Sequence, residues 1–235
     1  GVPSIINPDD KTGIEAALEL RDRVGGTVTV ISMGPPQADV ALREALAMGC
    51  DEAILVSGRE FGGSDTYATS GILAAALRKI GYDVIITGRQ AIDGDTAQVG
   101  PQIGEKLGIP QVSYVEEIRE AADDHLIVKR HFEDGYHIIK IKTPCLLTAI
   151  AELAKPRYMS VSGIVKAYES EIKIIGFEDL KDDLELDMIG LKGSPTNVYK
   201  SFTKEVKGAG TILKDVSAEQ AVAAIMEKLE AKHII

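Results

Sequence analysis

The sequence predicts an α/β fold, in which helices flank a largely parallel sheet, followed by a C-terminal arm that ends in a helix. Three observations favour this class. Helical and strand patterns alternate through residues 1–150, as in sheets whose strands are joined by helices. Residues 84–86, Val-Ile-Ile, form an apolar run typical of a strand covered on both faces. Beyond residue 150 the periodicity weakens, because glycine and proline interrupt every short pattern as far as residue 210.

The elements expected in the first part follow from hydrophobic spacing and from capping residues. A capping box at Thr12 and Glu15 predicts the start of the first helix, and Gly25 predicts its end. The same analysis predicts helices at residues 12–24, 38–48 and 65–80, strands at residues 27–32, 53–57 and 83–87, and three or four strands within 111–150, with a hairpin at 133–135 that closes the sheet in antiparallel fashion.

The chain is therefore expected to divide into an α/β domain at residues 1–150 and an arm at residues 151–235. The arm has too little periodic structure to bury much of itself. Its terminal helix is well specified, because Ser217 and Gln220 form a capping box ahead of an apolar stripe. We expect the arm to need either a partner surface or the body of the protein to cover it.

Composition excludes several classes of protein. The 235 residues carry a formal net charge of -10, which argues against binding to nucleic acid, because neutralising phosphates needs clustered Lys and Arg. No run of 18 or more apolar residues is present, and the first residues lack the basic and apolar segments of a signal peptide. The sequence predicts a soluble, cytoplasmic protein without membrane insertion.

Cysteine and histidine give no sign of a metal site. Cys50 and Cys145 are too few and too far apart for a disulfide framework or a metal cluster, so we expect buried thiols. Three histidines fall six residues apart, at 125, 131 and 137, but the turn signal at 133–135 separates them. That arrangement favours a solvated hairpin over a metal site.

The segment 88–101 is the strongest candidate for a binding site. It follows the strand expected at residues 83–87, and ligands of open α/β sheets lie beyond the carboxyl ends of strands. Gly88 and Gly94 would allow a backbone to approach a ligand closely.

The side chains of this segment suit a phosphate-bearing ligand. Asp95 and Gln98 are spaced to cap a helix whose free N–H groups would face an anion. Asp93 and Asp95 would repel phosphate unless they turn outward or bind ribose hydroxyls. We therefore expect phosphate contacts from backbone N–H groups and the Thr96 hydroxyl, with Arg89 adding positive charge.

Two other interpretations stay open on spacing alone. Residues 93–95 can be a turn with a helix cap and no ligand. Pro101 must lie near the first turn of the helix or kink its axis. The loop Gly62-Gly63-Ser64-Asp65 is similar to the pyrophosphate-binding loop of ATP pyrophosphatases, which leaves an ATP-pyrophosphatase-like enzyme or a nucleotide-sensing module as alternatives. The simpler interpretation is a loop in which Asp65 caps the helix that follows. The G-x-G-x-x-G fingerprint and the Walker A pattern are both absent from the positions that a nucleotide site requires.

Several motifs together resemble the β subunit of electron transfer flavoproteins over essentially the whole chain. They are Asn7-Pro8-Asp9-Asp10, Ser32-Met33-Gly34-Pro35, Gly88-Arg89-Gln90-Ala91-Ile92-Asp93-Gly94-Asp95 with Gln98, Pro156-Arg157-Tyr158, and Ile164-Val165-Lys166-Ala167.

The resemblance implies a Rossmann-like adenine-nucleotide-binding domain at residues 1–150 and an arm that embraces an α subunit in a heterodimer. The cofactor-binding positions that it implies are Asn7, Met33, Gly88, Arg89, Gln90, Ala91, Asp93, Gly94, Asp95, Thr96, Ala97, Gln98 and Val99. The implied partner-binding positions are Pro156, Arg157, Tyr158 and Val161, with Val161 as an apolar anchor for an acyl-CoA dehydrogenase. The subunit would carry electrons and would not be a free-standing enzyme.

The resemblance leaves two branches, which differ in the nucleotide bound. One branch binds AMP structurally, whereas the bifurcating branch binds FAD, takes electrons from NADH and delivers them also to a low-potential acceptor such as ferredoxin or flavodoxin. Small residues at Gly94 and Ala97 leave room for a flavin, and residues 167–171 are acidic where AMP-binding members are rich in lysine. We therefore expect FAD. Members of the family also begin with a strand that would precede Gly1, and we expect that strand in the centre of the sheet.

Overall fold

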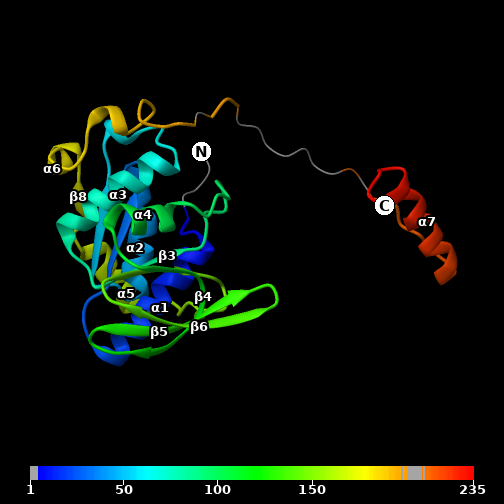
Figure 1. The fold of residues 1–235 in the computed structure, drawn as a ribbon, viewed down its shortest axis with the longest axis horizontal. Helices are drawn as coiled ribbons and strands as arrows, with labels where there is room; N and C mark the ends of the chain where they lie inside the picture. Colours follow the sequence, from blue (N-terminus) through cyan, green and yellow to red (C-terminus); the bar gives the residue numbers. More distant parts are fainter. Residues whose placement is uncertain (1–4, 197, 201–207, 209) are drawn as a thin grey trace. The chain divides into compact units, whose positions relative to one another are not determined.

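The computed structural model describes residues 5–196, 198–200, 208 and 210–235, which form two compact units, Gly1–Asn197 and Val198–Ile235. Figure 1 shows the first unit as layered helices and strands, with α7 in the second unit. In chain order the first unit contains α1 (Pro8–Val24), β1 (Thr29–Met33), η1 (Pro36–Ala38), α2 (Asp39–Met48), β2 (Glu52–Val56), η2 (Arg59–Phe61), α3 (Thr66–Ile80), β3 (Val84–Gly88), α4 (Val99–Leu107), β4 (Gln111–Ala121), β5 (His125–Phe132), β6 (Gly135–Lys142), β7 (Cys145–Ala149), α5 (Val161–Glu169), β8 (Lys173–Ile175), α6 (Phe177–Leu180) and η3 (Leu186–Met188). The predicted α/β class is confirmed.

The strands form two sheets, where the sequence predicts one. β1, β2 and β8 make a parallel sheet in the order β1-β2-β8, and the other strands are ordered β3-β7-β4-β5-β6. In the larger sheet β7 runs parallel to both of its neighbours, while β4, β5 and β6 are antiparallel (green in Figure 1). The expected hairpin joins β5 to β6, where Phe132 pairs with Gly135.

The apolar strand β3 is covered on both faces, as its sequence predicts. Ile85 packs with Ile103 of α4 in one cluster, and Ile86 lies against a second cluster that includes Leu20 of α1. However, β3 ends its sheet in the described part of the chain and does not occupy its centre. Burial on two faces therefore comes from helices packed on either side and does not require a central strand.

The helix α1 begins earlier than the capping box at Thr12 predicts, so that prediction is wrong. It starts at Pro8 with Asn7 as the N-cap, because proline is well suited to the first helical turn. Thr12 and Glu15 lie inside the helix and are buried.

The first compact unit extends to Asn197, beyond the boundary near residue 150 that the sequence predicts. β8 pairs with β2, where Ile175 lies opposite Val56, and so extends the smaller sheet. Ala167, Leu180 and Ile189 are buried against the body of the unit. These elements are too short to show a period, and they become stable by packing onto the body, which covers them.

The second unit contains the predicted terminal helix, α7 (Ala218–Glu230). Its capping box is confirmed, since the Ser217 hydroxyl accepts from the Gln220 N–H and the Gln220 side chain accepts from the Ser217 N–H. None of the helices in the described ranges combines the length and the apolar character that crossing a membrane requires.

Both cysteines are free and buried, as expected. Burial raises the pKa of Cys50 to about 12 and that of Cys145 to about 11, because a thiolate is poorly solvated in the interior. Both thiols stay protonated at neutral pH.

Candidate functional site

The candidate site lies where β3 ends and where α1 and α4 begin. Gly88, the last residue of β3, donates its backbone N–H to the Asp10 carboxylate at 2.6 Å. A Cβ added at Gly88 would lie 2.6 Å from the backbone nitrogen of Asp10 and 2.9 Å from the carbonyl carbon of Asp9. Glycine is therefore required here because α1 approaches the strand.

Asn7 ties the loop after β3 to the start of α1. Its side-chain amide donates to the Gln90 carbonyl oxygen and to the Asp10 carboxylate, both at 2.9 Å. The amide oxygen accepts from the Ile92 N–H at 3.0 Å. Asn7 thus holds the loop at Gln90 and at Ile92. It would influence a bound ligand by fixing the conformation of the loop.

Arg89 is held at the base of the loop. Its Nε lies 3.5 Å from the Asp9 carboxylate, and the guanidinium carbon lies 5.9 Å from the centre of the Tyr114 ring. The Nε is buried and makes no hydrogen bond to any described residue. Burial raises the pKa of Asp9, and Arg89 opposes that shift. The guanidinium charge therefore partly serves to balance a carboxylate inside the protein.

Asp95 does not cap α4, which contradicts the interpretation from spacing. Its carboxylate accepts from the side chain of Gln90, and its φ of 52° places it in the left-handed region. Gln98 is the N-cap residue by position, but its side chain accepts from the Thr66 hydroxyl at 2.8 Å and makes no cap hydrogen bond. Pro101 lies in the first turn of α4, where its lack of a backbone N–H costs no hydrogen bond within the helix.

The loop above this base is exposed, and α4 begins without a side-chain cap. Residues 91–96 are all exposed. The first N–H groups of any helix lack partners within the helix, and together with the helix dipole they attract anions. A Cβ added at Gly94 would meet nothing within 4 Å. The N–H groups of Ile92, Gly94 and Asp95 already have acceptors within the protein, so the free backbone donors that suit a phosphate-bearing ligand are those at the start of α4.

The remaining predicted cofactor position, Met33, lies at the end of β1. It is half-buried and packs against the cluster that contains Val56 and Phe61. The structure thus brings Asn7 together with residues 88–92, ties Gln98 to α3, and gives Met33 a place in the apolar core. Sequence reasoning did not assign a role to Asp10, although it lies in the motif that begins at Asn7.

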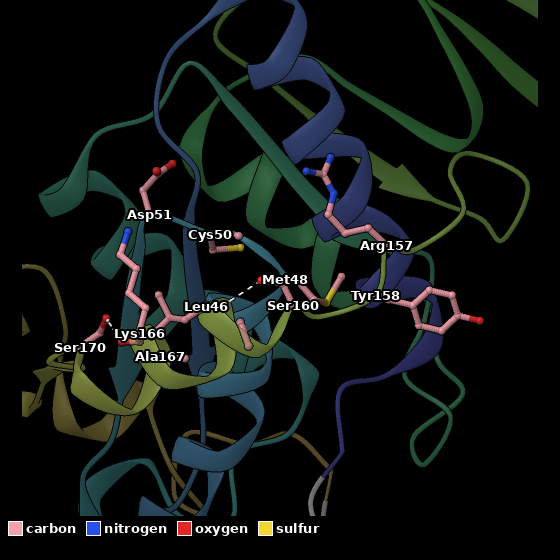
Figure 2. Close-up of a pocket in the computed structure, with 13 residues that line it drawn as sticks. Leu46, Met48, Cys50, Asp51, Arg157, Tyr158, Ser160, Lys166, Ala167 and Ser170 are labelled. Carbon is pink, nitrogen blue, oxygen red and sulfur yellow. Dashed lines mark hydrogen bonds between the residues drawn. The ribbon is translucent and has the colours of Figure 1, made fainter.

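The predicted partner-binding segment lies elsewhere, beside a pocket of about 300 Å³ between α2 and α5. Figure 2 shows the Arg157 side chain turned toward α1 and the Tyr158 ring pointing away from the body. Tyr158 is 96% exposed and Val161 is 81% exposed. Arg157 instead binds Glu15 and Asp22 of α1, so its guanidinium is engaged within the chain.

The loop at residues 62–65 is not an open phosphate cradle. A Cβ at Gly63 would meet the Leu191 side chain at 3.2 Å, and the Ser64 hydroxyl donates to the Phe61 carbonyl oxygen and accepts from the Gly190 N–H. The segment around residue 190 therefore covers this loop. The similarity to the pyrophosphate-binding loop was misleading, because spacing does not reveal what packs over a loop.

Asp65 serves this covered loop as a cap and a clamp. Its carboxylate accepts from the N–H groups of Tyr67 and Ala68 in α3, and from the N–H and hydroxyl of Thr196. Burial alone would raise the pKa of Asp65, but these hydrogen bonds outweigh burial and lower it.

We expect Asp65→Asn to lower the free energy of unfolding by about 1 kcal/mol at pH 7, because the charge-assisted hydrogen bonds are weakened. A lowered pKa in the folded state stabilises the protein above the unfolded-state value, and this contribution is lost as the pH falls through the folded-state pKa. Urea unfolding at pH 7 and pH 3 should therefore show a difference between the two proteins that shrinks in acid. A difference that grows in acid would contradict the role given to the carboxylate.

The fold and the site define the class: an α/β protein in which an exposed loop at a strand end leads to a helix start without a side-chain cap. The electron transfer flavoprotein domain model matches residues 1–179. The chain is 56% identical over 235 residues to the electron transfer flavoprotein subunit beta of Clostridium acetobutylicum, covering 100% of this chain and 89% of that protein. The chain belongs to the electron transfer flavoprotein β-subunit family.

Two other relatives carry names that describe larger assemblies. The acryloyl-CoA reductase electron transfer subunit gamma of Anaerotignum propionicum is 53% identical, with 99% of this chain and 88% of that protein covered. The caffeyl-CoA reductase-Etf complex subunit CarD of Acetobacterium woodii is 51% identical, with 100% of this chain and 89% of that protein covered.

Proposed function

We propose that this chain pairs with an electron transfer flavoprotein α subunit and binds FAD in the loop at residues 88–99. In this proposal NADH is the electron donor, and electrons leave by two routes, toward an acyl-CoA dehydrogenase and toward a low-potential acceptor such as ferredoxin or flavodoxin. The names of the two acyl-CoA reductase relatives support a partner of that class. When bound, the flavin supplies the hydride and single-electron chemistry, and the protein orients it.

The observation that supports the proposal best is the exposed loop at residues 91–96, held at its base by Asn7 and Asp10. The described residues fit an adenosine-phosphate group. The uncapped start of α4 provides N–H donors, the exposed Thr96 provides a hydroxyl, and the exposed Asp93 can accept from ribose hydroxyls.

A structural AMP would use the same phosphate contacts, so the two nucleotides differ in the space that they need beyond the loop. The open space at Gly94 and the small side chain of Ala97 favour FAD. AMP remains the second candidate, because nothing in the loop itself repels the smaller nucleotide.

The nucleotide released from the purified heterodimer decides between them. We expect two FAD molecules per heterodimer after denaturation, measured by absorbance and mass spectrometry, whereas one FAD with one AMP would overturn the bifurcating form of the proposal.

In the variant Asn7→Ala the loop loses its two anchors, which contribute about 1 kcal/mol each. We expect it to lose most of the second nucleotide and to keep the α-subunit flavin. Equal loss of both would contradict the location of the site.

A further inference from the structure

A buried ion pair joins α1 to the segment that precedes α5. The Glu15 carboxylate accepts from the Arg157 backbone N–H at 2.9 Å and from its Nε at 2.9 and 3.0 Å, and lies 2.8 Å from an Nη. The same guanidinium binds the Asp22 carboxylate at 3.0 Å. The Glu15 side chain is only 4% exposed, whereas that of Arg157 is 34% exposed.

These contacts fix the backbone at the residue before an exposed apolar stretch. Glu15 of α1 accepts from both the backbone N–H and the side chain of Arg157. These contacts fix the position of the Arg157 backbone and the orientation of its side chain. The next residue, Tyr158, points away from the body (Figure 2). Tyr158 and Val161 are among the most exposed large apolar residues of the chain.

The other end of the stretch is also anchored. The Ser160 hydroxyl caps α5 by accepting from the Gly163 N–H at 2.9 Å. A Cβ at Gly163 would lie 2.6 Å from the Ala47 carbonyl oxygen, so the first turn of α5 presses on α2. Residues 158–161 thus span two fixed points, one on α1 and one on α2.

We infer that Glu15 is a positioning residue for partner docking, which acts through Arg157 to hold Tyr158 and Val161 in a preformed, exposed arrangement. The inference rests on the proposed function, which includes an acyl-CoA dehydrogenase as partner, and on the expectation from the family resemblance that Tyr158 and Val161 contact that partner. A segment that is ordered before binding avoids the entropy cost of ordering it in the complex, so holding it raises affinity without a direct contact. Glu15 itself is buried and cannot touch a partner.

The test uses the complete heterodimer and a purified acyl-CoA dehydrogenase as the probe. Glu15→Gln keeps an acceptor for the Arg157 N–H but removes the charge that holds the guanidinium. The Arg157 N–H donates to Glu15, so we expect amide hydrogen exchange at Arg157 to rise about tenfold and the dissociation constant for the probe to rise about tenfold. Glu178→Gln is the matched control, because the pair that Glu178 forms with Lys181 at the end of α6 is exposed, and the change should affect neither quantity.

A double-mutant cycle separates positioning from general damage. Val161→Ala alone should weaken docking about tenfold without changing exchange. The double variant Tyr158→Ala with Val161→Ala lacks both of the side chains that the ion pair positions, so adding Glu15→Gln to it should have little further effect. Independent, multiplying effects would overturn the inference, as would a Glu15→Gln protein with unchanged exchange or unchanged affinity.

Should Glu15→Gln fail to fold, Arg157→Lys tests the same pair, because lysine keeps the charge but lacks the fork that binds both carboxylate oxygens. The same shifts in exchange and affinity are expected. Unchanged affinity in Val161→Ala would instead overturn docking through this stretch.

Discussion

Gly88→Ala is expected to abolish nucleotide binding by this subunit and to lower its free energy of unfolding by about 3 kcal/mol. The added Cβ would lie 2.6 Å from the Asp10 backbone nitrogen, and that atom belongs to α1, so no side chain can rotate away. Either β3 or the first turn of α1 must move. Movement breaks the hydrogen bond from Gly88 to Asp10 and shifts the loop that Asn7 anchors.

Urea unfolding and the nucleotide content of the purified heterodimer measure the two effects of Gly88→Ala. Gly94→Ala is the matched control, because the same methyl group added there meets nothing within 4 Å. We expect Gly94→Ala to be as stable as the parent within about 0.5 kcal/mol. An equal free energy of unfolding in the two variants would contradict the claim that the approach of α1 to β3 requires glycine at position 88.

The second large effect is expected for Arg157→Ala, which should lower the free energy of unfolding by about 2–3 kcal/mol. Removing one partner of a buried ion pair leaves the other charge without compensation, which costs about 3–5 kcal/mol in fully buried pairs. The value expected here is smaller, because the guanidinium is 34% exposed and solvent screens it. The hydrogen bonds to Glu15 hold the pKa of Arg157 above its ordinary value, so the guanidinium stays charged at neutral pH.

Thermal and urea unfolding of Arg157→Ala should be compared with Arg119→Ala, whose pair with Glu117 is exposed on both sides. Exposed pairs contribute at most about 1 kcal/mol, so the control should change little. Adding Glu15→Gln to Arg157→Ala should restore part of the stability, because it removes the uncompensated buried charge. A double variant less stable than Arg157→Ala would contradict this account of the pair.

The helix α1 links the two regions that the proposals concern. Its first turn holds the loop after β3 through Asn7 and Asp10, and its later turns hold Arg157 through Glu15 and Asp22. A variant in one region should therefore be examined in both.

Local sequence patterns were sufficient to predict where two of the helices begin. Ser217 and Gln220 predicted the start of α7, and Asp65 predicted that of α3, because a cap depends on residues only two or three positions apart. The position of the loop at 88–101 and the family also followed from the sequence. The predicted start of α1 was wrong, because Thr12 and Glu15 have the spacing of a capping box but are buried inside the helix.

By itself, the sequence determined the α/β class, the alternation of elements to residue 150, the place of the exposed loop and the family. Only the tertiary structure decided that Gly88 faces α1, that the loop at 62–65 is covered, that residues 161–190 pack onto the body, and that Arg157 turns inward. The reason is physical: caps and periods are set by neighbours along the chain, whereas close packing depends on distant residues. Glu15 and Arg157 are 142 positions apart, and no local pattern records that they meet.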